Sequence, residues 1–337
     1  MAPVLVVPAA AVIGCTATAQ APLPDVAVST PRSIHIEQTI TGSVNNPLSG
    51  KYFYVDPTTS SVVAAAETQP LSSELLTIAG TPQVRWIGNE VPIDRVAADV
   101  NSYVRAAESV NKMPMLALYA IPHRDCGGFS ASGFATGDEY RAWISSLVEG
   151  LGTSQVLVVL EPDALTAMDC LPPDLQQERM DLLRDAVDTL TRKANVVLYI
   201  DGGHSRWLPA EELARRLIDV GVDRARGFSL NTSNFFTTAE EIAFGERVSA
   251  LTNGASYVVD TSRNGAGPAP DGPLNWCNPP GRAIGAAPTT NTTGPHADAY
   301  LWIKHPGESD GECHRGDPRS GLFFTQYAID LVRAATP

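Results

Sequence analysis

The sequence has few basic residues, and this shortage limits what the protein can bind. Lys and Arg number 24 against 37 Asp and Glu, which gives a formal net charge of -13 at pH 7. A nucleic-acid-binding surface needs clustered Lys and Arg to neutralise phosphates, and no such cluster occurs along the chain. We therefore expect no nucleic-acid partner and a neutral substrate, although acidity by itself also serves solubility.

Common metal and nucleotide motifs are missing too. The chain has no HExxH sequence, no phosphate-binding loop and no glycine-rich nucleotide motif, and no two cysteines have CxxC spacing. We therefore expect no cofactor and no metal. A metal-dependent hydrolase stays open as an alternative, with the ligands His123, Asp125, Asp163 and His204.

The apolar run at 4–12 is too short to span a bilayer, and it passes into small residues and prolines. Such a composition is typical of export segments, so we expect an export signal or membrane anchor at 1–30 and a linker at 31–45. Residues 12–15 also resemble a lipoprotein cleavage box. The expected location is therefore secreted, with anchoring to the cell envelope as an alternative.

Cysteine is sparse, with five in the chain, and Cys15 falls in the expected leader. An even number then remains for the folded part at 46–337, which is typical of disulfides in an exported protein. Three pairings are open among the remaining four, which are Cys126, Cys170, Cys277 and Cys313.

Seven short apolar runs repeat along the chain, and most are followed by a helical pattern. Several runs are nearly continuous, as expected for parallel strands covered on both faces. We therefore predict an α/β fold with a parallel sheet of about seven βα units, either closed into a barrel or open and doubly wound. The runs lie at 84–88, 115–121, 156–160, 196–200, 227–230, 257–259 and 299–303.

Carboxylates follow three of these runs: Asp125 the second, Asp163 the third and Asp310 the seventh. In a barrel the residues after each strand meet at one face, so closure would make these acids neighbours. Glycosidic cleavage needs one protonated carboxyl group and a second group for water or the sugar carbon, and grouped carboxylates raise one another's pKa. The pattern indicates a glycoside hydrolase, although any single acid would equally suit a helix cap.

Two tryptophans are candidate sugar platforms. Trp207 follows the fourth run, and Trp276 lies in a long loop without periodicity at 264–296. Indole rings stack on the flat faces of sugars, although a lone tryptophan more often packs in a core. Tryptophans alone would also suit a non-hydrolytic carbohydrate-binding protein.

Together these residues make the chain resemble glycoside hydrolase family 6, the cellulases that include bacterial endoglucanases and fungal cellobiohydrolases. The motifs, in order, are YAIPHRDC at 119–126, LEPDA at 160–164, YIDGGHSRW at 199–207, VDTSRNG at 259–265, WCN at 276–278, PTTNT at 288–292 and residues 299–311. The resemblance implies a distorted, incomplete TIM-like parallel barrel. It also implies a monomeric hydrolase that cuts β-1,4-glucan with inversion, acting on cellulose, cello-oligosaccharides or mixed-linkage glucan.

The resemblance also assigns roles. Asp163 would be the general acid, Asp125 would hold the acid's proton and help to handle water, and Asp310 would stabilise positive charge on the sugar or act as base. The implied disulfides are Cys126–Cys170 and Cys277–Cys313. The implied substrate-binding residues are Tyr119, His204, Trp207, Asn231, Trp276, Lys304 and Glu308.

Two features bear on details of the reaction. Similar enzymes carry a serine six residues beyond the RDC aspartate, where this chain has Ala131 between Ser130 and Ser132. We expect a neighbouring serine to serve the catalytic water, with Ser132 preferred. The short segment after Glu308 favours an open cleft and internal cutting, with exo action of the cellobiohydrolase type as the alternative.

Overall fold

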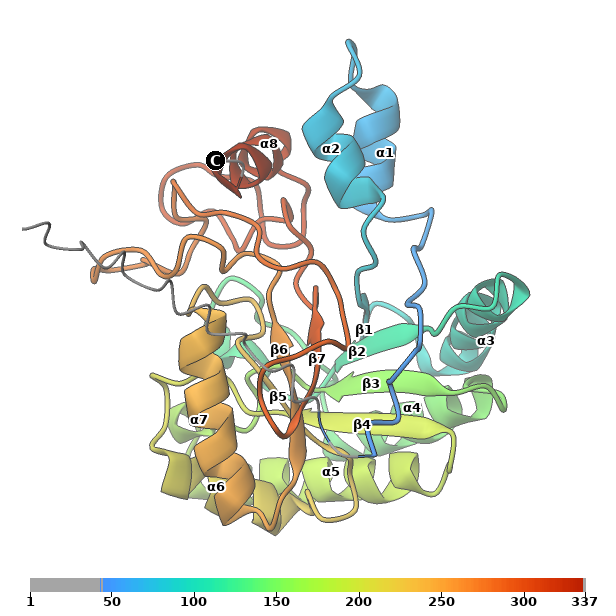
Figure 1. The fold of residues 1–337 in the computed structure, drawn as a ribbon. Helices are drawn as coiled ribbons and strands as arrows, with labels where there is room; N and C mark the ends of the chain where they lie inside the picture. Colours follow the sequence, from blue (N-terminus) through green and yellow to red (C-terminus); the bar gives the residue numbers. More distant parts are fainter. Residues whose placement is uncertain (1–42, 44, 336–337) are drawn as a thin grey trace, which may run out of the picture. The chain divides into compact units, whose positions relative to one another are not determined.

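The computed structural model describes residue 43 and residues 45–335, so the expected leader and most of the expected linker lie outside the described part. Seven parallel strands form one sheet in chain order (Figure 1). They are β1 Arg85–Gly88, β2 Met115–Tyr119, β3 Val156–Leu160, β4 Val196–Asp201, β5 Gly227–Leu230, β6 Ser256–Asp260 and β7 Ala297–Leu301. Each overlaps one of the seven predicted runs, and β7 begins two residues before its run.

The sheet curls but does not close. Every strand pairs with its neighbour in sequence, whereas no ladder joins β1 to β7 among the described residues. The two edges meet through a backbone bond from Val84 N to Trp302 O (3.0 Å) and a side-chain bond from Trp86 Nε1 to Ile303 O (2.7 Å). This confirms the prediction of an incomplete, TIM-like parallel barrel.

Both faces of the strands are buried, which explains the continuous apolar runs. Because successive strand residues point to opposite faces, alternate residues enter two different clusters. Met115, Ala117, Leu157 and Val159 pack in one cluster. The residues between them, such as Leu116 and Val158, pack in the larger cluster with helix residues.

Helices connect the consecutive strands from β1 to β6 and cover the outer face of the sheet, whereas a segment without a helix joins β6 to β7 (Figure 1). These are α3 Ile93–Ser109, α4 Gly137–Gly150, α5 Pro173–Thr191, α6 Ala210–Val220 and α7 Thr238–Leu251. A separate small group consists of α1 Ser60–Glu67, α2 Ser73–Ala79 and α8 Thr325–Ala335, which share a cluster around Trp302. No helix in the described ranges is long and apolar enough to cross a lipid bilayer.

Local sequence signals set the helix ends. The Thr136 hydroxyl accepts from Glu139 N, and the Glu139 carboxylate accepts from Thr136 N, which is a complete capping box at the start of α4. Thr237 caps α7 by accepting from Glu240 N. Helix α6 ends at Gly221, whose φ of 93° favours glycine.

Two disulfides confirm the pairing that the family resemblance implied. Cys126 pairs with Cys170 and joins the 3₁₀ turns Asp125–Gly127 and Ala167–Cys170, which follow β2 and β3. Cys277 pairs with Cys313 and joins the segments that follow β6 and β7. Both bonds therefore hold loops at the carboxyl ends of the strands.

Replacing Cys277 and Cys313 together with alanine is expected to lower the free energy of unfolding by about 4 kcal/mol, because the unfolded chain regains the freedom of a long loop. The bond closes a sequence separation of 36, and Cys126–Cys170 closes 44. Replacing Cys126 and Cys170 together with alanine should therefore lower the free energy of unfolding by a similar amount. Urea unfolding of the two double variants tests this, and losses below about 1 kcal/mol in both would contradict the chain-entropy origin.

Candidate active site

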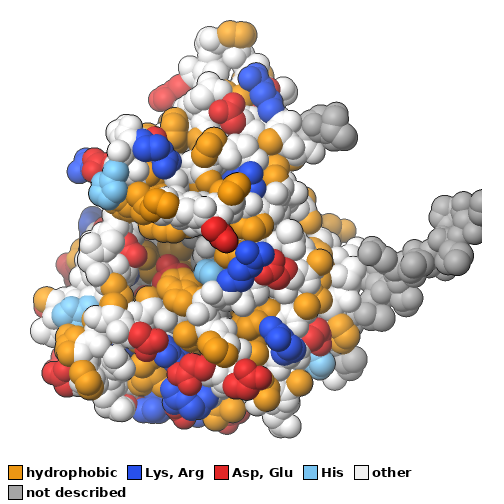
Figure 2. Space-filling model, turned by 90° about the vertical axis from the view of Figure 1, so that its left-hand side faces the viewer, with side chains coloured by type: hydrophobic (Ala, Val, Ile, Leu, Met, Phe, Trp, Pro, Cys, Tyr) orange, Lys and Arg blue, Asp and Glu red, His pale blue; other side chains and the backbone are white. Residues whose placement is uncertain are grey.

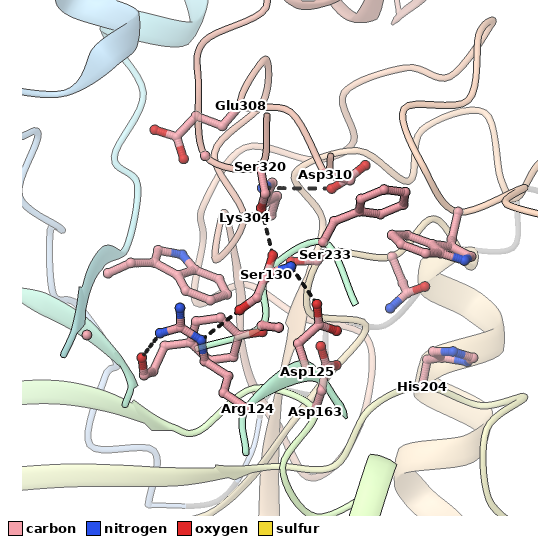
Figure 3. Close-up of a pocket in the computed structure, with 18 of the residues that line it drawn as sticks. Arg124, Asp125, Ser130, Asp163, His204, Ser233, Lys304, Glu308, Asp310 and Ser320 are labelled. Atoms are coloured by element: carbon pink, nitrogen blue, oxygen red, sulfur yellow. Dashed lines mark hydrogen bonds and ion pairs between the residues drawn. The ribbon is translucent and has the colours of Figure 1, made fainter. Parts of the chain in front are cut away.

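A cleft of about 810 Å³ lies where the carboxyl ends of the strands converge. Figure 2 shows a recess whose walls carry hydrophobic, acidic and histidine side chains, and Figure 3 shows the residues of the cleft. Most of the predicted site residues line it, although they come from five different strand ends. These are Tyr119, Asp125, Ser130, Asp163, His204, Trp207, Trp276, Lys304, Glu308 and Asp310.

Asp163 lies just after β3 in the left-handed backbone region, with a φ of 69°. Burial, the charge of Asp201 and the charge of Asp125 raise the pKa of Asp163 well above its ordinary value. A raised pKa favours the protonated form of this carboxyl group, which lines the cleft. Asp163 is therefore suited to donate a proton.

Asp201, the last residue of β4, was missed by sequence reasoning as a site residue. Its buried carboxylate accepts from Asp163 N (3.0 Å), Gly203 N (3.0 Å), Ser229 Oγ (2.9 Å) and Thr232 Oγ1 (2.6 Å). Burial raises the pKa of Asp201, and these donors act against the rise. Asp201 thus places a negative charge next to Asp163. The sequence feature that could have identified Asp201 is an acidic residue at the end of an apolar run.

Asp125 lies beside Asp163 in the cleft (Figure 3). Its Oδ2 atom accepts from Ser130 N at 2.6 Å. Burial raises the pKa of Asp125, while the bond from Ser130 and the charge of Arg124 oppose the rise. The loop needs Gly128, because a Cβ there would lie 2.6 Å from the Asp125 carboxylate.

Asp310 is held by cations. Arg263 Nη1 donates to its Oδ2 atom at 2.8 Å, and Lys304 Nζ lies 3.7 Å from its Oδ1 atom. Asn278 N also donates to Oδ2 at 3.0 Å. These contacts fix the orientation of the Asp310 carboxylate in the cleft. Arg263 is fully buried and was not predicted as part of the site.

Aromatic rings line part of the cleft. Trp207 and Trp276 keep exposed fractions of 37% and 42%, which leaves ring faces free for a ligand. His204 packs between Trp207 (5.2 Å) and Phe236 (4.4 Å), and burial lowers the pKa of His204 to about 4, so its ring is neutral. Further lining residues that the sequence did not single out include Trp86, Glu90, Phe129, Arg206, Asn234, Phe236, Asn275 and Ser320.

Two predicted residues do not line the cleft. Asn231 is fully buried, and its amide bonds to Phe236 O (3.1 Å) and Asp260 O (2.9 Å), so its place is in the scaffold and not against a substrate. Ser132 turns its hydroxyl to Asn89 Oδ1 at 3.1 Å. Of the two candidate serines, Ser130 lines the cleft, whereas Ser132 forms an isolated antiparallel bridge with Arg124 and does not line it.

The metal-dependent alternative finds no support in the geometry. Within residues 43 and 45–335, no group of three or more His, Cys, Asp or Glu side chains is placed to hold a metal ion. Of the four ligands considered, His123 does not line the cleft.

Two known proteins are similar to this chain over most of its length. Endoglucanase A of Cellulomonas fimi is 42% identical over 291 residues, 86% of this chain and 62% of the relative, so the chain spans less than two thirds of that protein. Endoglucanase 1 of Streptomyces halstedii is 40% identical over 83% of this chain and 88% of the relative.

A solved structure is also similar. It is the endoglucanase Cel6 from Mycobacterium tuberculosis in complex with methyl-cellobiosyl-4-deoxy-4-thio-β-D-cellobioside, with 60% identity and a TM-score of 0.86, covering 87% of this chain and all of that chain. The model of the family described as "Glycosyl hydrolases family 6" matches residues 48–335. On this match and on the cleft that its motifs build, the chain belongs to glycosyl hydrolase family 6.

Proposed function

We propose that this chain is an endo-acting β-1,4-glucanase that inverts the anomeric carbon. The observation that carries the proposal is a half-buried carboxyl group with a raised pKa, Asp163, beside a second carboxylate, Asp125, in a cleft with exposed indole rings. The names of the similar proteins, endoglucanases of bacteria, and the cello-oligosaccharide analogue in the similar structure point to the same substrate class.

The residues divide the reaction between them. Asp163 donates its proton to the glycosidic oxygen as the bond breaks. The Asp310 carboxylate, held by Arg263 and Lys304, stabilises positive charge that develops on the sugar ring. Asp125 accepts a proton that the attacking water releases, and water attack from the opposite face produces inversion.

Internal cutting suits the open walls of the cleft. The segment 311–324, between Asp310 and α8, is short and carries two cleft residues, Ser320 and Gly321. Trp207 and Trp276 are partly exposed in the cleft, where the rings of a glucan chain can stack on them. Exo action of the cellobiohydrolase type is the competing hypothesis.

The proposal extends to substrate and location. We expect amorphous cellulose, cello-oligosaccharides and mixed-linkage glucan as substrates. We expect the enzyme to act as a monomer. The two disulfides suit an oxidising, extracellular compartment. An envelope anchor in the leader is a second possibility, testable by fractionating cells of the producing organism.

Ser130 is expected to serve the catalytic water. Its amide bonds to Asp125, and its hydroxyl lies 2.6 Å from the Ser320 hydroxyl in the cleft. Ser130→Ala should lower kcat by about tenfold or more, because the variant lacks the hydroxyl that we expect to pass a proton from the catalytic water toward Asp125. Ser132→Ala is the matched control and should keep kcat within about twofold. Equal losses in both variants would contradict this assignment.

The decisive test compares viscosity loss with reducing-end release from carboxymethyl cellulose. An endo enzyme lowers viscosity steeply before many ends appear, whereas an exo enzyme releases ends with little loss of viscosity. No hydrolysis of this polymer or of mixed-linkage glucan, together with retained binding of cello-oligosaccharides, would show a carbohydrate-binding protein and overturn the proposal.

A further inference from the structure

The open seam between β1 and β7 contains a histidine that the reaction does not use. His305 follows Lys304 in the segment after β7, and its side chain is only 11% exposed. Its Nε2 atom lies 2.7 Å from Val84 O, next to the start of β1. Its Nδ1 atom lies 2.9 Å from Glu308 Oε1. One ring therefore contacts both edges of the open barrel.

Both partners of the ring are acceptors, and this settles the protonation state that the geometry needs. A backbone carbonyl has no hydrogen to donate, and a carboxylate is acceptor-only. A neutral imidazole carries one N–H, so it can satisfy Val84 O or Glu308 but not both. Only the imidazolium, with two N–H groups, makes the two bonds at once.

Glu308 connects this ring to the cleft. Its carboxylate lines the cleft (Figure 3) and also accepts from Ser60 Oγ of α1 at 2.7 Å. With a side chain only 18% exposed, Glu308 has little freedom while both bonds exist. Losing the His305 bond would release one of the two restraints on this carboxylate.

We propose that the His305 imidazolium is a positioning residue that ties the β1 edge to the segment after β7 and fixes Glu308 for substrate contact. When the ring loses its proton, glucan binding weakens while the chemistry at Asp163 continues. The inference rests on the proposed function in one respect, that Glu308 contacts the glucan.

The electrostatic environment supports a charged ring. Burial by itself lowers the pKa of His305, but the charge of Glu308 and the bonds to Glu308 and Val84 O outweigh burial and the repulsion of Lys304, and leave it above its usual 6.5. The pKa of Glu308 is lowered to about 2, because His305, Lys304 and Ser60 outweigh its burial. Both shifts favour the charged forms of the pair.

The direction of the pH effect follows from these shifts. A folded pKa above the unfolded value means that protonated His305 stabilises the fold at low pH. That contribution, and the fixed position of Glu308, are lost as the pH rises through the raised pKa of His305. Glu308 stays ionised over this range, so within this pair the change belongs to the histidine.

The test measures the Kd of cellotetraose by calorimetry between about pH 5 and pH 9, in an Asp163→Asn background that prevents hydrolysis. NMR of the imidazole resonances gives the pKa of His305 directly. We expect Kd to rise about five- to tenfold through the same pH at which the ring loses its proton. A Kd that stays flat through that pH would overturn the proposal.

Two variants test separately the two bonds that the His305 ring makes, one to Val84 O and one to Glu308. The Gln amide nitrogen of His305→Gln reaches the Nε2 position and keeps the Val84 bond, whereas that of His305→Asn reaches the Nδ1 position and keeps the Glu308 bond. We expect Kd to rise more in the Gln variant, Tm to fall more in the Asn variant, and neither Kd to follow the pH profile of the wild type. Changes of Kd and Tm in parallel in both variants would show a merely structural role.

A second histidine–glutamate pair provides the control. His296 Nδ1 lies 2.6 Å from Glu246 Oε2, and neither residue lines the cleft. His296→Asn should leave the pH profile of Kd unchanged, and a shift there would overturn the assignment to His305. If cellotetraose does not bind at any pH, the proposed function fails. The structural role of the His305 imidazolium is then still tested, by measuring whether Tm falls as the ring loses its proton.

Discussion

Asp163→Asn should lower kcat on glucan by about 10²- to 10⁴-fold, the largest catalytic effect we expect from a single substitution. The amide is close in size to the carboxyl group and keeps the backbone bond from Asp163 N to Asp201, but it has no proton acidic enough to give to the leaving oxygen. Initial rates of reducing-end release from carboxymethyl cellulose measure the loss. Equal Tm values for the two proteins would show that the fold is intact.

The leaving group supplies a sharp control for this prediction. An aryl cello-oligosaccharide with an acidic phenol departs without protonation, so its release depends little on a general acid. The Asp163→Asn protein should therefore lose far less activity on the aryl substrate than on the polymer. Losses of the same size on both would show that Asp163 acts in some way other than by proton donation.

Asp201→Asn should move the alkaline limb of the kcat/KM profile to lower pH. Asp163 works when it is protonated, so activity falls as the pH rises through the pKa of Asp163. The charge of Asp201 is one of the causes that raise this pKa, next to burial. An uncharged amide removes that contribution, the pKa falls, and less of the acid is protonated at neutral pH. We expect kcat/KM at pH 7 to drop about ten- to hundredfold.

Asp260→Asn is the matched control for Asp201. Asp260 is also a fully buried acid at the end of a strand, and it accepts from Ser233 N, Ser262 N and Lys304 N. Its replacement should cost stability without moving the alkaline limb, because Asp260 is not among the groups that raise the pKa of Asp163. A limb that moves equally in both variants would point to a general loosening of the site.

The acids at strand ends show how far sequence reasoning reached. Asp163 was identified correctly as a cleft residue, as were Asp125 and Asp310. Glu161, two residues before Asp163, instead turns back under the neighbouring loop and accepts from Ala120 N and Ile121 N. The position of an acid after a strand could not tell a cleft residue such as Asp163 from a scaffold residue such as Glu161, because residues two positions apart in one loop point in different directions.

The serine next to Ala131 shows the same limit on a smaller scale. The sequence narrowed the choice to Ser130 and Ser132, and preferred the second. The loop places Ser130 in the cleft beside Ser320, a residue 190 positions away in the chain, and turns Ser132 to Asn89. The direction of each hydroxyl depends on the path of the loop that Asp125 and Arg124 hold, which no local pattern records.

By itself the sequence determined the order and type of the elements, the parallel sheet and the motifs of the family, because apolar periodicity and turn residues act over a few neighbouring positions. It also supplied the carboxylates and tryptophans, as a set. Only the tertiary structure decided which acid has a raised pKa, which is paired with cations and which serves the scaffold. Those properties depend on burial and on charges brought together from distant positions, as Asp163 with Asp201 and Asp310 with Arg263.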